Sequence, residues 1–275
     1  MTLTTTAALL KHGAAAAVNV ITLENAEAIA IGAERAGRGV ILQLSQNAIA
    51  FHGGLRPILL ACREVAAAST APLALHLDHL DDLALVNEAI TLAGEAGLGS
   101  IMIDASRLEY AENVSVTADV VRRAHGAGLW VEAELGEIGG KDGAHALGVR
   151  TVPSEASAFV LATGVDGLAV AVGSSHAMLE RSASIDLELV ARLATAVGVP
   201  LVLHGSSGVT DAQLTAAVAA GIRKVNVGTA LNIAGTAALR AALEADPGAV
   251  DPRGPLRASR AAMADVVARI CGVVG

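Results

Sequence analysis

The chain alternates short, almost purely apolar runs with Ala-rich stretches of helical periodicity along its whole length. Continuous apolar runs are typical of parallel strands covered on both faces, because neither face meets water. Gly37, Gly97 and Gly221 follow three of the helical stretches, where a left-handed glycine commonly ends a helix. We expect strands at residues 15–20, 39–45, 72–78, 100–104, 130–135, 167–172, 200–204 and 224–227.

Eight strands alternating with helices, without a linker or a break in composition, predict a closed α/β barrel of the (β/α)8 or TIM type. The 275 residues suit one such barrel, so we expect a single domain over residues 1–275. An open, doubly wound sheet is the alternative. The sequence has no GxGxxG after its first strand, which weakens a dinucleotide-binding version of that alternative.

Composition excludes several classes of protein. Hydrophobic residues make up 53% and charged residues 17% of the chain, which excludes disorder. No apolar run exceeds about five residues, whereas a membrane-spanning helix needs about 20, so no membrane association is expected. The net charge of −8 and the four aromatic residues (one Trp, one Tyr, two Phe) argue against nucleic-acid binding. The N-terminus lacks the pattern of a signal peptide, and Cys62 and Cys271 lack metal or redox spacing, which together predict a cytoplasmic protein with reduced thiols.

Polar residues gather at the C-terminal ends of the expected strands, where barrel enzymes assemble their active sites. This recurrence on all eight strands predicts an active site on that rim, in which Asn19 and Ser45 contact substrate. The residues are Asn19, Ser45, His76, Asp78, His79, Asp104, Ser106, Glu134, His176, His204 and Asn226.

Three of the rim residues are histidines on different strand ends, namely His79, His176 and His204. Three neutral imidazoles with one open position form a common catalytic zinc site. Asp78 directly precedes His79 and is either a buried partner of His76 or an acid/base group beside the metal. We favour the acid/base role, because a carboxylate near a cation is costly to bury without a function.

Two further carboxylates, Asp104 and Glu134, have two open interpretations. Each either orients a ligand histidine or contributes to a second cation site.

Two turns of small residues follow the seventh and eighth strands, at residues 204–208 and 226–229. Such loops offer backbone N–H groups and a helix N-terminus to a phosphate, and this is the usual phosphate site of barrels. We therefore expect phosphate binding there, by residues drawn from Gly205, Ser206, Ser207, Asn226, Val227, Gly228 and Thr229.

The chain resembles class II, metal-dependent fructose-bisphosphate aldolases and the tagatose-bisphosphate aldolases among them. The resemblance spans nearly the whole chain. It is carried by AVNV at 17–20, LHLDH at 75–79, SIMIDAS at 100–106, VEAELGEIGG at 131–140, TGVDGLAVAVGSSH at 163–176, LVLHGSSG at 201–208, KVNVGT at 224–229 and DPRGPL at 251–256.

The resemblance implies reversible cleavage of a ketose such as fructose- or tagatose-1,6-bisphosphate into dihydroxyacetone phosphate and an aldehyde, through a Zn²⁺-stabilised enediolate. It implies that the three histidines hold the metal, with Asp104 and Glu134 nearby at an alternative metal position. Asp78 would handle the C4 hydroxyl, while Gly205, Ser207, Asn226 and Thr229 would surround the dihydroxyacetone phosphate. Arg253 would reach a second phosphate, often from a neighbouring subunit, and a homodimer or homotetramer is expected by analogy.

Three departures from the family pattern stand out. Ala177 replaces a glycine after the second ligand histidine, which alters one expected phosphate contact. The loop after the glycine pair lacks the usual acidic pair, leaving Asp142 as the expected proton-abstracting base and Glu137 as its competitor. Ser45 is followed by residues 46–48, Gln-Asn-Ala, instead of the commoner glycine-containing turn.

Two other functions stay open at this point. One is a non-catalytic sugar-phosphate-binding homologue that has lost the loop base. The other is a Schiff-base aldolase, for which Lys224 is the candidate nucleophile.

Overall fold

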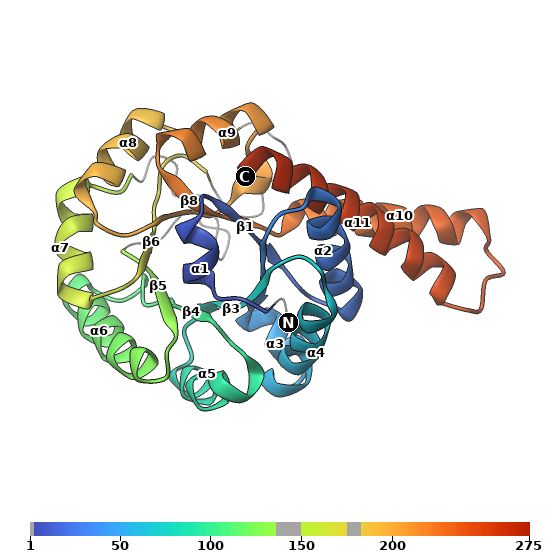
Figure 1. Ribbon diagram of the computed structural model, residues 1–275, viewed down its shortest axis with the longest axis horizontal. Helices are drawn as coiled ribbons and strands as arrows, with labels where there is room; N and C mark the ends of the chain where they lie inside the picture. The colour runs from blue at the N-terminus through green and yellow to red at the C-terminus, as the bar shows by residue number, and fades with distance from the viewer. Residues whose placement is uncertain (1–2, 136–149, 175–182) are drawn as a thin grey trace.

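The computed structural model describes residues 3–135, 150–174 and 183–275. Eight parallel strands pair in chain order, and β8 pairs back onto β1 (Figure 1). This closure confirms the predicted (β/α)8 barrel and excludes the open sheet. The strands are β1 (Ala15–Asn19), β2 (Val40–Ser45), β3 (Leu73–Leu80), β4 (Ser100–Ile103), β5 (Trp130–Glu134), β6 (Gly167–Ala169), β7 (Leu201–Leu203) and β8 (Ile222–Val227).

Helices surround the barrel, and the predicted glycines follow three of them. Asp82 caps α5 by accepting a hydrogen bond from the Ala84 N–H at 2.8 Å. Gly37 and Gly97 end α2 and α5 with φ of 62° and 63°, and Gly221 follows α9 with φ of 138°. The helices are α1 (Thr6–Lys11), α2 (Leu23–Ala36), α3 (Gln46–Phe51), α4 (Leu55–Ala68), α5 (Leu83–Ala96), α6 (Tyr110–Gly126), α7 (Pro153–Thr163), α8 (Leu187–Ala196), α9 (Asp211–Ala220), α10 (Thr229–Ala245) and α11 (Arg253–Val274).

Alternation along the strands separates the large outer core from the barrel interior. On β2, Val40, Leu42 and Leu44 join the main apolar cluster between barrel and helices, whereas Ile41 belongs to a separate small cluster. Gln43 lies on the same face as Ile41 and is fully buried. The inner face therefore carries the polar residues, while the outer face supplies most of the apolar burial.

The N-terminal end of the barrel is filled by apolar side chains. Leu10 of α1 packs with Ala15, Ala17, Ile41 and Ala74 from the first three strands. Hydrophobic packing at this end leaves the opposite end of the barrel for polar side chains.

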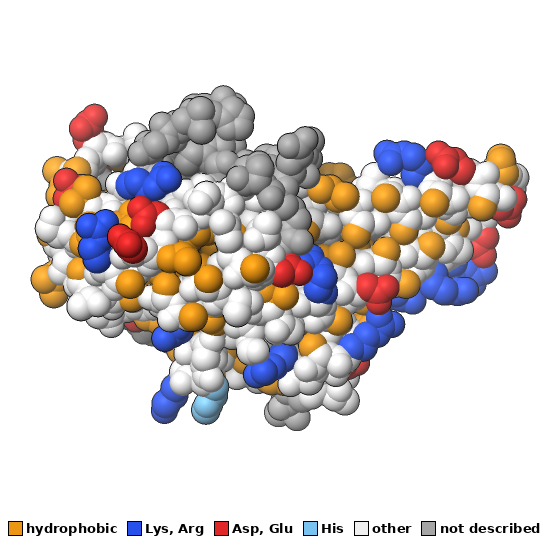
Figure 2. Space-filling model, turned by 90° about the horizontal axis from the view of Figure 1, so that it is seen from above, with side chains coloured by type: hydrophobic (Ala, Val, Ile, Leu, Met, Phe, Trp, Pro, Cys, Tyr) orange, Lys and Arg blue, Asp and Glu red, His pale blue; other side chains and the backbone are white. Residues whose placement is uncertain are grey.

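A long helical hairpin of α10 and α11 projects from one side of the barrel (Figure 1). Seen from above, it carries apolar side chains along its length and charged ones toward its tip (Figure 2). Val250, in the connection between the two helices, is 95% exposed. The returning α11 packs along α2 beside the barrel. Among the residues that the structure describes, no helix has the length and apolar character needed to cross a membrane.

The α2–α11 contact depends on a glycine. A Cβ atom on Gly32 would lie 2.5 Å from the Val267 Cβ and 2.7 Å from the Ala264 carbonyl oxygen. We expect Gly32→Ala to lower the free energy of unfolding by about 1–3 kcal/mol, the usual cost of overpacking. Gly94→Ala is the matched control, since Gly94 lies in α5 with open space around it, and it should add about 0.5–1 kcal/mol. Urea unfolding measures both, and equal effects would contradict this packing.

Candidate active site

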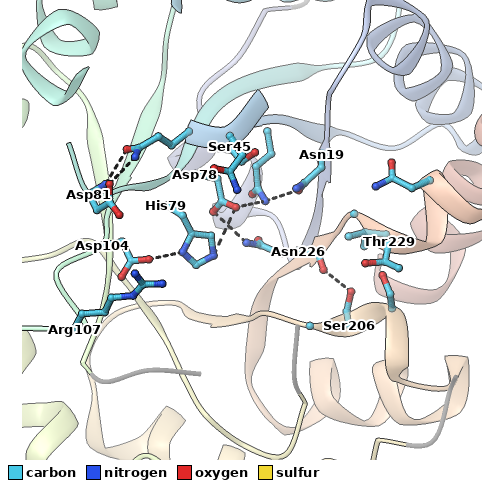
Figure 3. A pocket seen from close by; sticks show the side chains of 18 residues that line it. Asn19, Ser45, Asp78, His79, Asp81, Asp104, Arg107, Ser206, Asn226 and Thr229 are labelled. Carbon is cyan, nitrogen blue, oxygen red and sulfur yellow. Dashed lines mark hydrogen bonds and ion pairs between the residues drawn. The ribbon is translucent and has the colours of Figure 1, made fainter. Parts of the chain in front are cut away.

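A cavity of about 430 Å³ opens at the C-terminal ends of the strands (Figure 3). Loops and strand ends from around the barrel contribute to it. Its lining residues are Asn19, Gln43, Ser45, Gln46, Asn47, Asp78, His79, Asp81, Asp104, Arg107, Gly205, Ser206, Ser207, Asn226, Val227, Gly228, Thr229 and Asn232.

A bulge in β3 brings two successive side chains to this cavity. In a regular strand, Asp78 and His79 would point to opposite faces. Here the pairing of β3 with β4 shifts register between Leu77 and Leu80, and His79 has a φ of 52°. A bulge re-aims side chains in this way, and a positive φ is uncommon outside glycine. The bulge also extends β3 to Leu80, two residues beyond the predicted end at Asp78.

Carboxylates fix the orientation of His79, which lines the cavity, and of His204, which is buried beside it. The Nδ1 atom of His79 lies 2.7 Å from the Asp104 Oδ2, and the Nε2 atom of His204 lies 2.8 Å from the Glu132 Oε1. An ionised carboxylate can only accept, so these nitrogens carry the protons. The lone pairs are then on Nε2 of His79 and Nδ1 of His204. Carboxylates orient metal-binding histidines in this same manner.

Ligand atoms from several of these residues converge. One atom each from Asp78, His79 and His204 lies within 4.8 Å of the others, and so does one each from His79, Asp104 and Glu134. Imidazole nitrogens and carboxylate oxygens are the donors that zinc takes in catalytic sites. The donor set therefore fits a divalent metal ion, with His79 shared between the two clusters. Both interpretations of Asp104 stay open, because Asp104 belongs to the second cluster and also accepts a hydrogen bond from the His79 ring.

Asp78 lies between positive and hydrogen-bonding groups. The Gln43 Nε2 donates to its Oδ2 at 3.0 Å, and the Asn226 Nδ2 donates to its Oδ1 at 3.4 Å. Burial would raise the pKa of Asp78, but His79, the other nearby histidines and the Lys224 ammonium hold that pKa well below its usual value. Asp78 is therefore an ionised carboxylate at the cavity.

The opposite side of the cavity is made by the loops after β7 and β8. Gly205 has a φ of 66° and begins a single 3₁₀ turn, and the Ser206 hydroxyl donates to the backbone oxygen of Asn226. This bond ties the two loops together. Gly228 and Thr229 begin the 17-residue helix α10 at the cavity wall. The N-terminus of such a helix presents N–H groups and a favourable dipole to an anion.

The family model described as fructose-bisphosphate aldolase class-II matches residues 1–275 of the chain. The chain belongs to the class II fructose-bisphosphate aldolase family. Members of this family are carbon–carbon lyases. The chain is 34% identical over 265 residues to the D-tagatose-1,6-bisphosphate aldolase subunit GatY of Klebsiella oxytoca, covering 94% of this chain and 92% of that protein.

Solved structures agree with this assignment. The crystal structure of the YdjI aldolase from Escherichia coli K12 has a TM-score of 0.83 and 31% identity, over 98% of this chain and 94% of that one. The fructose-bisphosphate aldolase of Campylobacter jejuni has a TM-score of 0.80 at 20% identity, over 98% and 92% of the two chains, and shows the shared fold.

Most residues that the sequence indicated for an aldolase site do come together. The cavity is lined by Asn19, Ser45, Asp78, His79, Asp104, Gly205, Ser206, Ser207, Asn226, Val227, Gly228 and Thr229. His204 and Glu134 are buried beside it, at 0% and 1% exposure. Arg253 is elsewhere, at the start of α11, where its 81% exposed side chain pairs with Asp251. Asp142, His176 and Ala177 lie outside the described residues.

Sequence reasoning missed several residues of the aldolase site, among them Gln43, Glu132 and Arg107. Gln43 and Glu132 are fully buried and each bonds a site residue, and Arg107 lines the cavity after β4. Alternation could have identified two of them, because Gln43 precedes Ser45 by two residues and Glu132 precedes Glu134 by two, which places each pair on one face. Arg107 lies in a loop, where no periodic pattern applies.

If His204 holds the metal, His204→Ala should raise the zinc dissociation constant by more than about 100-fold, which exceeds the usual effect of losing an orienting partner. His12→Ala is the control, because His12 is exposed at the end of α1. Competition with a fluorescent chelator measures both affinities. Wild-type affinity in His204→Ala would remove this residue from the ligand set.

Proposed function

We propose that this protein is a zinc-dependent aldolase that reversibly cleaves a phosphorylated ketose, similar to fructose- or tagatose-1,6-bisphosphate, into dihydroxyacetone phosphate and an aldehyde. The observation that carries the proposal is the convergence of ligand atoms from Asp78, His79 and His204, which lie within 4.8 Å of one another at the C-terminal end of the barrel. His176 is proposed as the third imidazole ligand. Asp104 and Glu134 provide a neighbouring position for a cation.

The reaction requires proton transfer at one carbon, C3, and at one hydroxyl, on C4. A zinc ion bound here supplies a Lewis acid for the ketone oxygen. In the cleavage direction, Asp78 accepts the C4 hydroxyl proton as the C3–C4 bond breaks and the aldehyde leaves. The Nδ2 group of Asn226, which lies 3.4 Å from the Asp78 Oδ1, donates in this proposal to the negatively charged oxygen of the resulting enediolate. Protonation at C3 then gives dihydroxyacetone phosphate.

Phosphate binding orients the substrate in this scheme. The loops at Gly205–Ser207 and Gly228–Thr229 hold the phosphate of the dihydroxyacetone part, since they combine small residues with a helix N-terminus. Arg107 lies across the cavity from Ser206 and Thr229, beyond His79 (Figure 3). The aldehyde half of the ketose therefore extends toward Arg107.

Arg253 takes part only if a second copy supplies it, because within one chain it lies outside the cavity lining. This requirement and the projecting hairpin support a homodimer or homotetramer, in which one subunit's Arg253 binds the second phosphate of its neighbour's substrate.

Both cysteines are buried free thiols, in keeping with the reducing cytoplasm.

The position of Lys224 argues against a Schiff-base mechanism. Its side chain is fully buried and pairs with Glu132 at 2.8 Å, and it is absent from the cavity lining. A substrate carbonyl in the cavity therefore does not meet its ammonium group.

Asp78→Ala tests the acid/base role. Cleavage should fall by about 10²–10⁴-fold, the usual contribution of such a group, while zinc content stays near one equivalent with the fold intact. Asp265→Ala serves as the control, since Asp265 pairs with Arg35 on the surface. Turnover and metal content are measured on the same samples. If the variant instead loses zinc and added zinc restores its turnover, Asp78 is a structural residue.

The proton-abstracting base is proposed to be Asp142, with Glu137 as the competitor, and both lie outside the described residues. Hydrogen exchange at the reacting carbon of dihydroxyacetone phosphate isolates enolisation from cleavage. Asp142→Asn should slow this exchange by about 10²-fold or more while phosphate binding persists. Normal exchange in Asp142→Asn with loss in Glu137→Gln would assign the base to Glu137. Absence of exchange in the wild type would favour the non-catalytic sugar-phosphate-binding homologue.

A further inference from the structure

A buried ammonium lies beneath the cavity, in a position that the proposed reaction does not use. Lys224 is in the middle of β8, on the same face as Asn226, and its side chain has no exposure. Burying such a charge costs several kcal/mol unless partners compensate it. The identity and orientation of those partners therefore carry information about what the lysine does.

Three oxygens surround the ammonium group. The Lys224 Nζ donates to the Glu132 Oε2 at 2.8 Å, to the Asn226 Oδ1 at 2.8 Å and to the Gln43 Oε1 at 3.1 Å. A lysine ammonium has three protons and no acceptor, and its contact with the His76 Nε2 is longer, at 3.5 Å, so the three oxygens are its main acceptors. Gln43 and Asn226 must consequently present their amide oxygens to it.

This requirement fixes the orientation of two side-chain amides. With its oxygen on Lys224, Gln43 directs its Nε2 to the Asp78 Oδ2 at 3.0 Å and to the Asn19 Oδ1 at 2.8 Å. Asn226 likewise directs its Nδ2 to the Asp78 Oδ1 at 3.4 Å. Both oxygens of Asp78 thus face N–H donors. Either amide, if turned by 180°, would place its oxygen against this carboxylate.

The third partner connects the lysine to a metal-binding histidine. The Glu132 carboxylate forms a fully buried ion pair with the Lys224 ammonium at 2.8 Å. The ionised Glu132 accepts from Lys224 on one oxygen and from the His204 Nε2 on the other. The proton of His204 is thereby held on Nε2, on the side away from the ligand cluster.

We infer that Lys224 is a positioning residue that sets the direction of the hydrogen bonds in the active site. Through Gln43 and Asn226 it turns N–H groups toward Asp78 and the reacting oxygens, and through Glu132 it holds His204 in its metal-binding tautomer. The inference rests on the proposed function for its effect on turnover. Its effect on metal affinity is independent of the substrate.

Two variants separate the two branches of this network. The amide branch runs from Lys224 through Gln43 and Asn226 to Asp78, and the zinc-binding branch runs from Lys224 through Glu132 to His204. Lys224→Met keeps the length of the side chain and removes every donor. The amides of Gln43 and Asn226 then lose the bond that fixes their orientation, and the Glu132 carboxylate loses its counter-ion. The double variant Lys224→Met with Glu132→Gln removes the charge pair together, and its new amide still has an oxygen to accept from His204. The double variant also keeps the test valid if the single variant fails to fold because of its uncompensated charge.

The zinc-binding branch is measured by chelator competition and by the visible absorption of the cobalt-substituted protein. Lys224→Met should raise the zinc dissociation constant by about 10–100-fold and change the cobalt spectrum, as loss of an orienting partner does. The double variant should bind zinc within a few-fold of the wild type. Gly32→Ala is the control for stability alone, since it lowers stability on the outer face of the barrel without touching the site.

The amide branch is measured by steady-state cleavage. Both Lys224 variants should lose about 10²–10³-fold in kcat, the usual effect of losing a preorganised donor, with KM nearly unchanged. Variants that match Gly32→Ala in zinc affinity, cobalt spectrum and kcat would overturn the inference. A wild type that binds zinc but cleaves no sugar phosphate would refute the proposed function, and the metal measurements would still decide the role of Lys224.

Discussion

A lysine ammonium without solvent contact has to be matched by acceptors, and inside this barrel Glu132, Gln43 and Asn226 supply them. Removing one partner of a buried charge pair typically costs about 3–5 kcal/mol, so this arrangement is strongly held. Each acceptor directs its other polar atom toward the cavity, to Asp78 or to His204. The buried charge of Lys224 therefore sets which polar atoms Gln43, Asn226 and Glu132 direct toward Asp78 and His204.

The bulge in β3 imposes the second constraint. It brings Asp78 and His79 to the same cavity from adjacent positions, at the cost of a positive φ at His79. Two interactions with Asp104 hold this conformation, namely the 2.7 Å contact with the His79 ring and the 2.8 Å hydrogen bond from the Asp104 N–H to the Leu80 oxygen. The proposed proton acceptor and the proposed metal ligand are thus placed within reach of the same substrate atoms.

The accuracy of prediction from the sequence differed between levels of structure. Burial pattern and helix caps are local properties, so the eight strands and their helices followed from the residues alone. The polar residues of the rim were found for the same reason, as Asn19, Asp78 and Asn226 lie at or near the C-terminal ends of the expected strands. The end of β3 was placed two residues early, because its bulge depends on pairing with β4 and leaves no periodic signal.

The sequence by itself determined the barrel, the rim that holds the active site and the family, since each depends on residue order and local pattern. Only the tertiary structure decided the directions of the hydrogen bonds within the site. Glu132 and Lys224 are separated by 92 positions, and Gln43 and Lys224 by 181, yet these contacts decide which way each amide and imidazole points. Hydrogen bonding is directional, and those donors and acceptors come within reach of one another only when the strands close into a barrel.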